Sequence, residues 1–324
     1  MISIEQLLEK LQAEIESHSY GENPAELYDP IKYMMSLGGK RFRPLLTLIA
    51  ASIYTNEWET AIKPAMAVEV FHNFTLMHDD IMDRAPLRRG EPTVHEKWNA
   101  NTAILSGDVM LIRAYDLLLD IPKERLRLVL ERFNCTAGEV CEGQQLDMNF
   151  ETRWDVSEEE YLEMIRLKTS VLLGFALELG GIIGRADEKS IKLLYSAGEN
   201  IGIGFQLKDD LLDVYGDPSK FGKQVGGDII SNKKTFLLIE ALSRAGGDIL
   251  ADLQRWIAME TFEKNDKVNA VRDIYEALDI RSFTEEKIKA YFTRGIDCLK
   301  QLDIDNDRKT FLLAFVQQLV EREK

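Results

Sequence analysis

The amino-acid sequence predicts an all-α protein that folds as a single domain over residues 1–324. Apolar residues recur at the three- and four-residue spacing of helices through almost the whole chain. Alternating patterns bounded by Asn-Gly or Asp-Gly turns, which indicate β-hairpins, are absent from the sequence. No stretch rich in Gly, Ser or Pro separates two parts of the chain, and 45% hydrophobic residues suffice for a substantial core. We therefore expect a bundle of roughly a dozen helices.

The predicted helices begin with an amphipathic segment near the N-terminus. Its apolar residues are Ile4, Leu7, Leu8, Leu11 and Ile15. Two mostly apolar stretches, 64–83 and 189–213, predict long central helices, because a helix that is apolar on most faces is a buried one. Ser157 followed by Glu160 predicts a capping box that opens another long helix, and Asp307 is predicted to cap the last one. Helix starts or loops are predicted at Pro24, Pro30, Pro44, Pro64, Pro86, Pro92, Pro122 and Pro218.

The net charge of −15 and the pI of about 4.9 exclude several functions. A chain this acidic lacks the basic stripe of a nucleic-acid-binding surface and is repelled by anionic membranes. Its three cysteines have no Cys-x-x-Cys spacing, which favours reduced thiols and a cytoplasmic location. The N-terminus is acidic rather than basic and then apolar, unlike a signal peptide. No run reaches the ~18 to 20 apolar residues that span a bilayer, so we expect no membrane span.

Two clusters with the pattern Asp-Asp-x-x-Asp follow the two long apolar stretches. The first contains Asp79, Asp80 and Asp83, and the second contains Asp209, Asp210 and Asp213. Residues i and i+4 share a helix face, so the outer two carboxylates of each cluster point the same way. Chance gives roughly 0.1 match to this pattern in a chain of this aspartate content, so two matches favour a function.

A solvated helix face is the alternative explanation for any acidic cluster. Here each cluster ends an apolar helix, where unpaired carboxylates repel one another and resist burial. Mg²⁺ relieves such repulsion, since it binds through one or two carboxylates and completes its shell with water and phosphate oxygens. The clusters therefore predict Mg²⁺ sites at the ends of two helices.

Basic residues accompany the first cluster on both sides. Arg88 and Arg89 follow it, and two adjacent arginines can each form paired hydrogen bonds with a phosphate. A glycine-opened segment, 38–44, carries three cations into a predicted helix start, where backbone N–H groups can also face an anion. This segment lacks the Walker A spacing, so nucleotide hydrolysis is not supported.

Further candidate groups lie near both clusters in the sequence. Lys168 and Thr169 lie inside a predicted helix, and three lysines flank the loop after the second cluster, namely Lys223, Lys233 and Lys234. Taken singly, each is typical of a surface lysine, whereas together they surround the clusters. His72 precedes Asp79 by one to two helical turns and is either a structural histidine or a ligand contact.

These residues, in this order, resemble the trans-isoprenyl diphosphate synthase (polyprenyl synthetase) family of isoprene biosynthesis. The resemblance covers about residues 38–238 and rests on the segments GGKRFRP, HNFTLMHDDIMDRAPLRRG, TAILSGD, GQQLD, LKTS, FQLKDDLLD, GK and NKKT. It implies the isoprenoid synthase fold, an all-α bundle around a deep central cavity, and a homodimer.

The resemblance also assigns roles to residues of this chain. It implies that isopentenyl diphosphate is bound by Lys40, Arg43, His72 and Arg89. It implies that an allylic diphosphate is bound by Arg88, Lys168, Thr169, Gln206, Lys223 and Lys233. About three Mg²⁺ ions are expected, held mainly by Asp79, Asp83 and Asp209 and supported by Asp80, Asp210 and Asp213. The catalytic residues implied are Asp79, Asp83, Arg88, Lys168, Asp209 and Lys223.

The implied enzyme is a prenyltransferase that ionises the allylic substrate, joins it to isopentenyl diphosphate and eliminates a proton. Product length is expected to depend on Phe74 and Phe71, which lie about one and two turns before Asp79. A helical turn of about 5.4 Å is comparable to one isoprene unit. Within the family a bulky residue at position 74 marks short-chain enzymes, and Thr75 is not a second aromatic, so we expect C20 over C15.

Two alternative functions remain open. A class I terpene cyclase shares the fold and one Asp-rich helix but binds no second diphosphate, so residues 38–44 and the arginine pair would lack a purpose. A non-catalytic regulatory subunit of a prenyl synthase tends to lose one cluster, whereas this chain keeps both.

Overall fold

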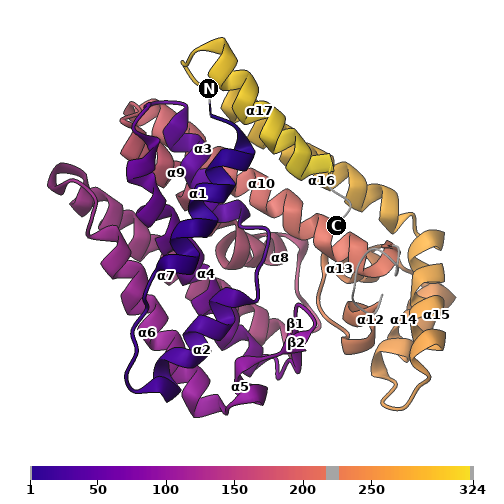
Figure 1. Ribbon diagram of the computed structural model, residues 1–324. Helices are drawn as coiled ribbons and strands as arrows, with labels where there is room; N and C mark the ends of the chain where they lie inside the picture. The colour runs from indigo at the N-terminus through magenta and orange to yellow at the C-terminus, as the bar shows by residue number, and fades with distance from the viewer. Residues whose placement is uncertain (1, 217–225, 322–324) are drawn as a thin grey trace. The chain divides into compact units, whose positions relative to one another are not determined.

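The computed structural model describes residues 2–216 and 226–321, which are almost entirely helical (Figure 1). The first helices are α1 (Ile4–Ser17), α2 (Ala25–Ser36), α3 (Phe42–Ser52), the 3₁₀ turn η1 (Trp58–Ala61), α4 (Ile62–Met82), α5 (Val94–Lys97), α6 (Ala100–Leu118) and α7 (Lys123–Glu151). They are followed by α8 (Glu158–Ile165), the π turn η2 (Arg166–Ser170), α9 (Val171–Gly184) and α10 (Glu188–Tyr215). The last are α12 (Gly227–Ser231), α13 (Phe236–Arg244), α14 (Gly247–Ala258), α15 (Lys264–Ala277), α16 (Ile280–Lys300) and α17 (Asn306–Glu321). The predicted all-α class is confirmed.

Contacts divide the chain into two compact units, each assembled from three segments. The first unit contains Met1–Cys135, Leu172–Tyr195 and Gln301–Leu312. The second contains Thr136–Val171, Ser196–Lys300 and Leu313–Lys324. Helices such as α7 and α10 contribute residues to both. The single domain expected from the sequence stays a prediction.

In the first unit, α4 packs along α6 and against α3 (Figure 1). Every residue of α4 from Pro64 to Phe71 is buried, as the apolar stretch in the sequence predicts. Gly107 of α6 allows the close approach of α4, since a Cβ there would lie 2.3 Å from Nε2 of His78. The C-terminal end of α4, which carries the first acidic cluster, is thus held against α6.

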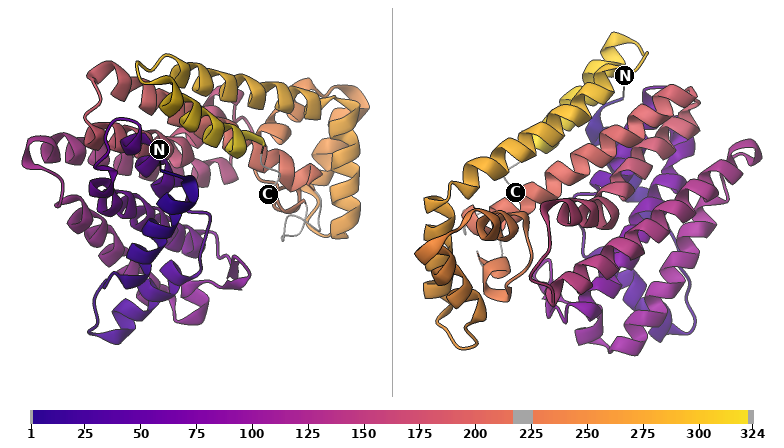
Figure 2. Two further views of the ribbon diagram at one scale, coloured as in Figure 1. Left: turned by 45° about the horizontal axis from the view of Figure 1, so that its top comes forward. Right: turned by 180° about the vertical axis from the view of Figure 1, so that it is seen from behind.

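In the second unit, an apolar core joins the last turn of α10 to the helices that follow it. Val214 of α10 packs with residues from α13, α14, α15 and α16, including Leu237, Leu253, Tyr275 and Ile280. These helices are grouped together in Figures 1 and 2, where α14 and α15 are orange. The core therefore holds the last turn of α10, directly after Asp213.

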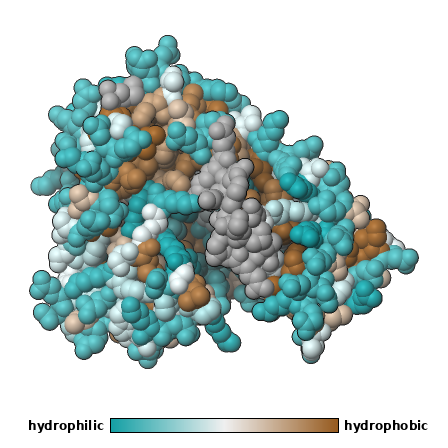
Figure 3. Space-filling model, turned by 45° about the vertical axis from the view of Figure 1, so that its right-hand side comes forward, coloured by the Kyte–Doolittle hydropathy of each residue, from teal (hydrophilic) through white to brown (hydrophobic). Residues whose placement is uncertain are grey.

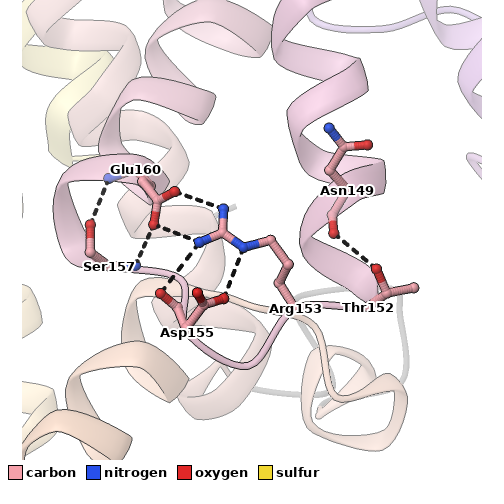
Figure 4. Close-up of polar contacts among 6 residues, drawn as sticks. All are labelled: Asn149, Thr152, Arg153, Asp155, Ser157 and Glu160. Atoms are coloured by element: carbon pink, nitrogen blue, oxygen red, sulfur yellow. Dashed lines mark hydrogen bonds and ion pairs between the residues drawn. The ribbon is translucent and has the colours of Figure 1, made fainter.

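The capping box at the start of α8 is confirmed (Figure 4). Ser157 N donates to Glu160 Oε2 at 3.0 Å, and Glu160 N donates to Ser157 Oγ at 3.2 Å. Arg153, which the sequence analysis does not single out, donates to Glu160 Oε1 at 2.7 Å and to Asp155 Oδ1 at 2.9 Å. Hydrogen bonds from Arg153 and from Ser157 N lower the pKa of the Glu160 carboxyl.

Two local predictions are wrong, and one short ribbon has no counterpart in the sequence patterns. Pro30 lies inside α2, where the burial of Pro30, Ile31, Met34 and Met35 offsets the missing backbone donor. Within residues 2–216 and 226–321 one short antiparallel ribbon forms, between β1 (Leu87–Arg88) and β2 (Glu91–Pro92). The last helix is capped by Asp305 rather than by Asp307, since Asp305 Oδ1 accepts from Asp307 N at 2.9 Å.

One continuous helical run, Glu158–Gly184, is long and apolar enough to cross a membrane. This run is not an unbroken apolar stretch, since it contains charged residues such as Lys168 and Glu178. The window is 89% buried by the rest of the protein, which is typical of a core helix in a soluble protein. The face drawn in Figure 3 is mainly hydrophilic, with scattered apolar patches.

Candidate functional site

The first acidic cluster ends α4 in the first unit. Asp79 and Asp80 lie in the last turn, and Asp83 is the C-cap, with its N–H donating to Asp79 O at 2.8 Å. Asp79 is half-buried and Asp83 is exposed, so both carboxylates of this face are accessible. The C-terminus of a helix carries partial negative charge, so carboxylates there are unfavourable without a cation. A bound cation would therefore stabilise this end of α4.

Asp80 differs from its neighbours because its carboxylate is buried and held by Arg88 of β1. Arg88 Nε and Nη2 donate to Asp80 at 2.7–2.9 Å, and the Asp80 side chain is 2% exposed. The paired bonds fix the Arg88 guanidinium, which is 25% exposed, beside the end of α4. The Asp80 carboxylate therefore orients the Arg88 guanidinium. The metal-supporting role expected for Asp80 stays a prediction.

The β1–β2 turn presents Arg89 to the segment that begins at Gly38. Arg89 and Gly90 form the turn with φ of 56° and 84°, the positive values that a tight hairpin turn of this kind requires. Arg89 Nη1 donates to Gly38 O. Gly39, at φ of 131°, leaves room for that guanidinium, since a Cβ there would lie 2.8 Å from Arg89 Nη2.

Arg43 and His72 meet on the other side of this segment. Arg43 Nη1 lies 3.2 Å from His72 Nε2. Burial, then the charges of Arg43, Arg89, Arg88 and Arg41, lower the pKa of His72 well below its usual value. A neutral imidazole accepts from Arg43 at Nε2, so its proton is assigned to Nδ1. Several arginines thus gather around one neutral histidine, which makes a local basic site in an acidic protein.

The neutral state of His72 predicts a pH dependence of stability. The unfolded chain binds a proton at His72 below about pH 6.5 and the folded chain does not, so this residue makes folding less favourable as the pH falls through that value. We expect the free energy of unfolding, measured by urea denaturation without divalent ions, to fall more between pH 7.5 and pH 5.5 in the native chain than in His72→Gln. Parallel profiles of the two proteins would show that His72 protonates normally.

In the second unit, Lys168 and Thr169 lie in the π turn η2. The turn is flanked by two glycines that let neighbouring helices approach its backbone. A Cβ on Gly143 of α7 would lie 2.2 Å from Lys168 N, and one on Gly202 of α10 would lie 2.6 Å from Ser170 Cα. Such single π turns are frequent at functional sites, because they redirect side chains within a helix.

Asp147 of α7 is a functional candidate that the sequence analysis quoted within GQQLD but left without a role. Lys168 Nζ donates to Asp147 Oδ2 at 2.6 Å. Burial alone would raise the pKa of the Asp147 carboxyl, yet Lys233 and Lys168 bring it below its usual value. The carboxylate therefore stays ionised, bonds to Lys168 and attracts the charge of Lys233, two of the predicted diphosphate ligands. In the sequence, Asp147 lies one helical turn after Gly143, and this spacing within GQQLD could have singled out Asp147 as a site residue.

The second acidic cluster lies in the last turns of α10. Asp209 is exposed, whereas Asp210 is 4% exposed and accepts from the Tyr161 hydroxyl and from Gln206 Nε2 at 3.1 Å. Thr169 Oγ1 donates to Gln206 Oε1 at 3.2 Å, which extends this network to the π turn. Burial, then the charge of Asp228, raises the pKa of Asp210 to about 7.

Asp213 is hydrogen-bonded to residues at the start of α12. Its Oδ2 accepts from Asp228 N at 2.9 Å, and its backbone oxygen accepts from Gly226 N at 2.7 Å, so it holds the first turn of α12. Lys233 follows α12, and its N–H donates to Asp228 O at 2.9 Å. Lys223 lies outside the described residues.

The predicted chain-length residues belong to an aromatic cluster in the first unit. Phe71 is 1% exposed and packs on Phe133 of α7 with ring centroids 5.1 Å apart. Phe74 packs on Phe71 at 5.6 Å, and Phe133 packs on Phe175 of α9 at 5.7 Å. Thr75 Oγ1 donates to His72 O at 2.8 Å. Phe74 is thus the half-buried edge of a packed aromatic wall.

The donor groups fit Mg²⁺. Within residues 2–216 and 226–321 no three acidic, histidine or cysteine side chains converge as a complete protein cage. Mg²⁺ does not need one, because it binds through one or two carboxylates and takes its other oxygens from water and substrate phosphates. Asp79 with Asp83, and the exposed Asp209, offer such incomplete sets of hard oxygen donors.

Comparisons with known proteins show the family to which the chain belongs. The polyprenyl synthetase family model matches residues 24–277. The geranylgeranyl diphosphate synthase of Methanosarcina mazei is 36% identical over 93% of this chain and 91% of its own length, and that of Saccharolobus solfataricus is 37% identical over 90% and 89%. A geranylfarnesyl diphosphate synthase of Natronomonas pharaonis is 35% identical over 82% and 85%.

Solved structures are similar throughout. A geranylgeranyl pyrophosphate synthase covers 100% of both chains with 46% identity and a TM-score of 0.95. The geranylgeranyl pyrophosphate synthetase of Pyrococcus horikoshii covers 98% of this chain and 97% of its own, with 34% identity and a TM-score of 0.91. The family predicted from the motifs is confirmed. The chain belongs to the polyprenyl synthetase family.

Proposed function

We propose that the chain condenses isopentenyl diphosphate with an allylic diphosphate to give a short-chain, all-trans prenyl diphosphate. The observation that carries this proposal is the basic site of the first unit, where Arg43 contacts the neutral His72 of α4 and Arg89 donates to Gly38 O. The relatives named geranylgeranyl diphosphate synthase support the same reaction. The chain is thus an enzyme of the trans-prenyltransferase class.

The residues take the roles that their geometry favours. Lys40, Arg43, His72 and Arg89 bind isopentenyl diphosphate, and Asp147 keeps Lys168 and Lys233 in place for the allylic diphosphate. Asp79, Asp83 and Asp209 would hold Mg²⁺, which would supply positive charge to the leaving diphosphate. The apolar residues before each cluster exclude water, which would otherwise quench the allylic cation. The released diphosphate is a suitable base for the final proton.

We propose a C20 product in preference to C15. Phe74 lies at the edge of the aromatic wall formed with Phe71 and Phe133, which limits the space below Asp79. Thr75 adds a small polar side chain there instead of a second ring. The C20 products named for several relatives support this length.

A single assay separates this function from the two alternatives. The purified chain is incubated with Mg²⁺ and dimethylallyl, geranyl or farnesyl diphosphate, with and without isopentenyl diphosphate, and released diphosphate is measured. A prenyltransferase releases diphosphate only when isopentenyl diphosphate is present. Release from the allylic substrate alone would indicate a cyclase, and no release with any primer would indicate a regulatory subunit.

We also propose that the chain acts as a homodimer through α6. Ile104, Leu105 and Ile112 lie on one face of this helix and are 43%, 58% and 56% exposed in the single chain. Residues at these spacings fall within about 100° of helix surface, which suits packing against a second helix. Sedimentation equilibrium is expected to give twice the chain mass of 37.0 kDa. A monomer at micromolar concentration would contradict the proposal.

A cytoplasmic location is proposed as well. The three cysteines are free thiols, which suits a reducing compartment.

A further inference from the structure

The segment 38–43, which leads from α2 into the first turn of α3, carries three cations, and they do not share one orientation. Lys40 is exposed, and Arg43 lies against His72. Arg41 is only 4% exposed and is turned into the first unit. Because Arg41 is buried, it cannot contact a diphosphate, and its charge must be paired within the protein.

The partners of Arg41 lie on α4 and at the end of α2. Its Nη1 donates to Glu69 Oε1, and its Nη2 donates to Met35 O at 2.7 Å. The two side chains of the ion pair are 2% and 3% exposed. Asn73, one turn further along α4, donates to Glu69 O at 2.8 Å and to Glu69 Oε1 at 3.0 Å, so the carboxylate is itself held in place.

The backbone conformation of Arg41 also indicates that its buried side-chain contacts are needed. Arg41 is the N-cap of α3 and has φ of 49° and ψ of 32°, in the left-handed region. This conformation is unfavourable for residues with a Cβ and easy for glycine. An arginine there needs compensating contacts from its side chain, and the buried pair with Glu69 supplies them.

The pair completes a set of contacts that fixes this segment to α4 and to the β1–β2 turn. Glu69 precedes His72 by three residues, so neighbouring turns of α4 hold Arg41 and Arg43. Arg89 holds the segment at Gly38 O. Lys40 lies between these fixed points.

We propose that Arg41 and Glu69 are positioning residues that set Lys40 and Arg43 for the diphosphate of the homoallylic substrate. This inference rests on the proposed function, since it assigns the segment 38–43 to isopentenyl diphosphate. It predicts that loss of the pair weakens the binding of that substrate alone.

The test is a double replacement, Arg41→Met with Glu69→Met. A buried ion pair can often be replaced by apolar residues of similar volume without loss of stability, whereas removal of one partner strands a charge. We expect the KM for isopentenyl diphosphate to rise about 10- to 100-fold, because small displacements of binding groups have effects of this size. The KM for the allylic substrate and kcat at saturation stay unchanged, as expected when only ground-state binding is lost.

Arg41→Lys provides a second, milder variant. Lysine keeps the charge but lacks the planar fork that reaches both Glu69 and Met35 O, so its KM for isopentenyl diphosphate is expected to lie between those of the native and double-variant proteins. The matched control is Arg132→Met with Glu178→Met, another ion pair of the first unit. It is expected to leave this KM unchanged.

A native KM for isopentenyl diphosphate in either folded Arg41 variant, with folding checked by circular dichroism, would overturn the inference. So would an equal rise in both KM values. If the native chain does not consume isopentenyl diphosphate at all, the proposed function fails instead, which distinguishes the two failures.

Discussion

Replacement of Asp79 by asparagine is expected to lower kcat about a thousandfold. Asp79 and Asp83 offer accessible carboxylates on one face at the C-terminal end of α4. An amide is a neutral and weaker ligand for Mg²⁺, and the metal contributes several kcal/mol to stabilising the leaving diphosphate. A loss of about 4 kcal/mol corresponds to three orders of magnitude in rate. The measurement is product formation at saturating substrates over a range of Mg²⁺ concentrations.

Asp120→Asn is the matched control for this variant. Asp120 lies in the same unit, is 54% exposed and pairs with Lys63 at the surface, away from the cluster. Its replacement is expected to leave the rate and the Mg²⁺ dependence unchanged. If the Asp79→Asn protein kept more than about a tenth of the native rate, Asp79 would not be a required Mg²⁺ ligand.

Replacement of Phe74 by alanine is expected to lengthen the product beyond C20. Phe74 is half-buried at the edge of the wall formed by Phe71 and Phe133, about one helical turn from Asp79. Removal of its ring opens about one turn, 5.4 Å, of depth, which is comparable to one isoprene unit. Chromatography and mass analysis of the products would detect the shift.

Thr75→Phe tests the same wall in the opposite direction. A second ring beside Phe74 is expected to shift the product from C20 toward C15. The control is Phe283→Ala, because Phe283 is an exposed aromatic residue of the second unit. If neither Phe74→Ala nor Thr75→Phe changed the product distribution, these residues would not set product length.

Much of the fold was predictable because helical periodicity is a local property of the sequence. The stretches 64–83 and 189–213 correspond to α4 (Ile62–Met82) and α10 (Glu188–Tyr215) within two residues at each end. The errors occur where tertiary contacts outweigh local preference. Pro30 is tolerated inside α2 because its neighbours are buried, and the β1–β2 ribbon is too short to show an alternating pattern.

The candidate site was predictable in its residue types but not in its internal contacts. Clusters of aspartate and adjacent arginines are visible in the sequence, since their spacing along one helix or turn decides which way they face. The pairings of Asp147 with Lys168 and of Tyr161 with Asp210 join residues 21 and 49 positions apart. No local pattern indicates such contacts. Nor does the sequence show that Arg41, alone of the three cations in its segment, is turned inward.

The proposed prenyltransferase activity is tested most directly by the mass of the product that the purified chain makes alone. The chain is incubated with Mg²⁺, unlabelled dimethylallyl diphosphate and ¹³C-labelled isopentenyl diphosphate, and the prenyl diphosphates are analysed by mass spectrometry. We expect a C20 diphosphate in which every isoprene unit but the first is labelled, and no product when Mg²⁺ is chelated. Recovery of unchanged dimethylallyl diphosphate with no longer prenyl diphosphate would contradict this activity.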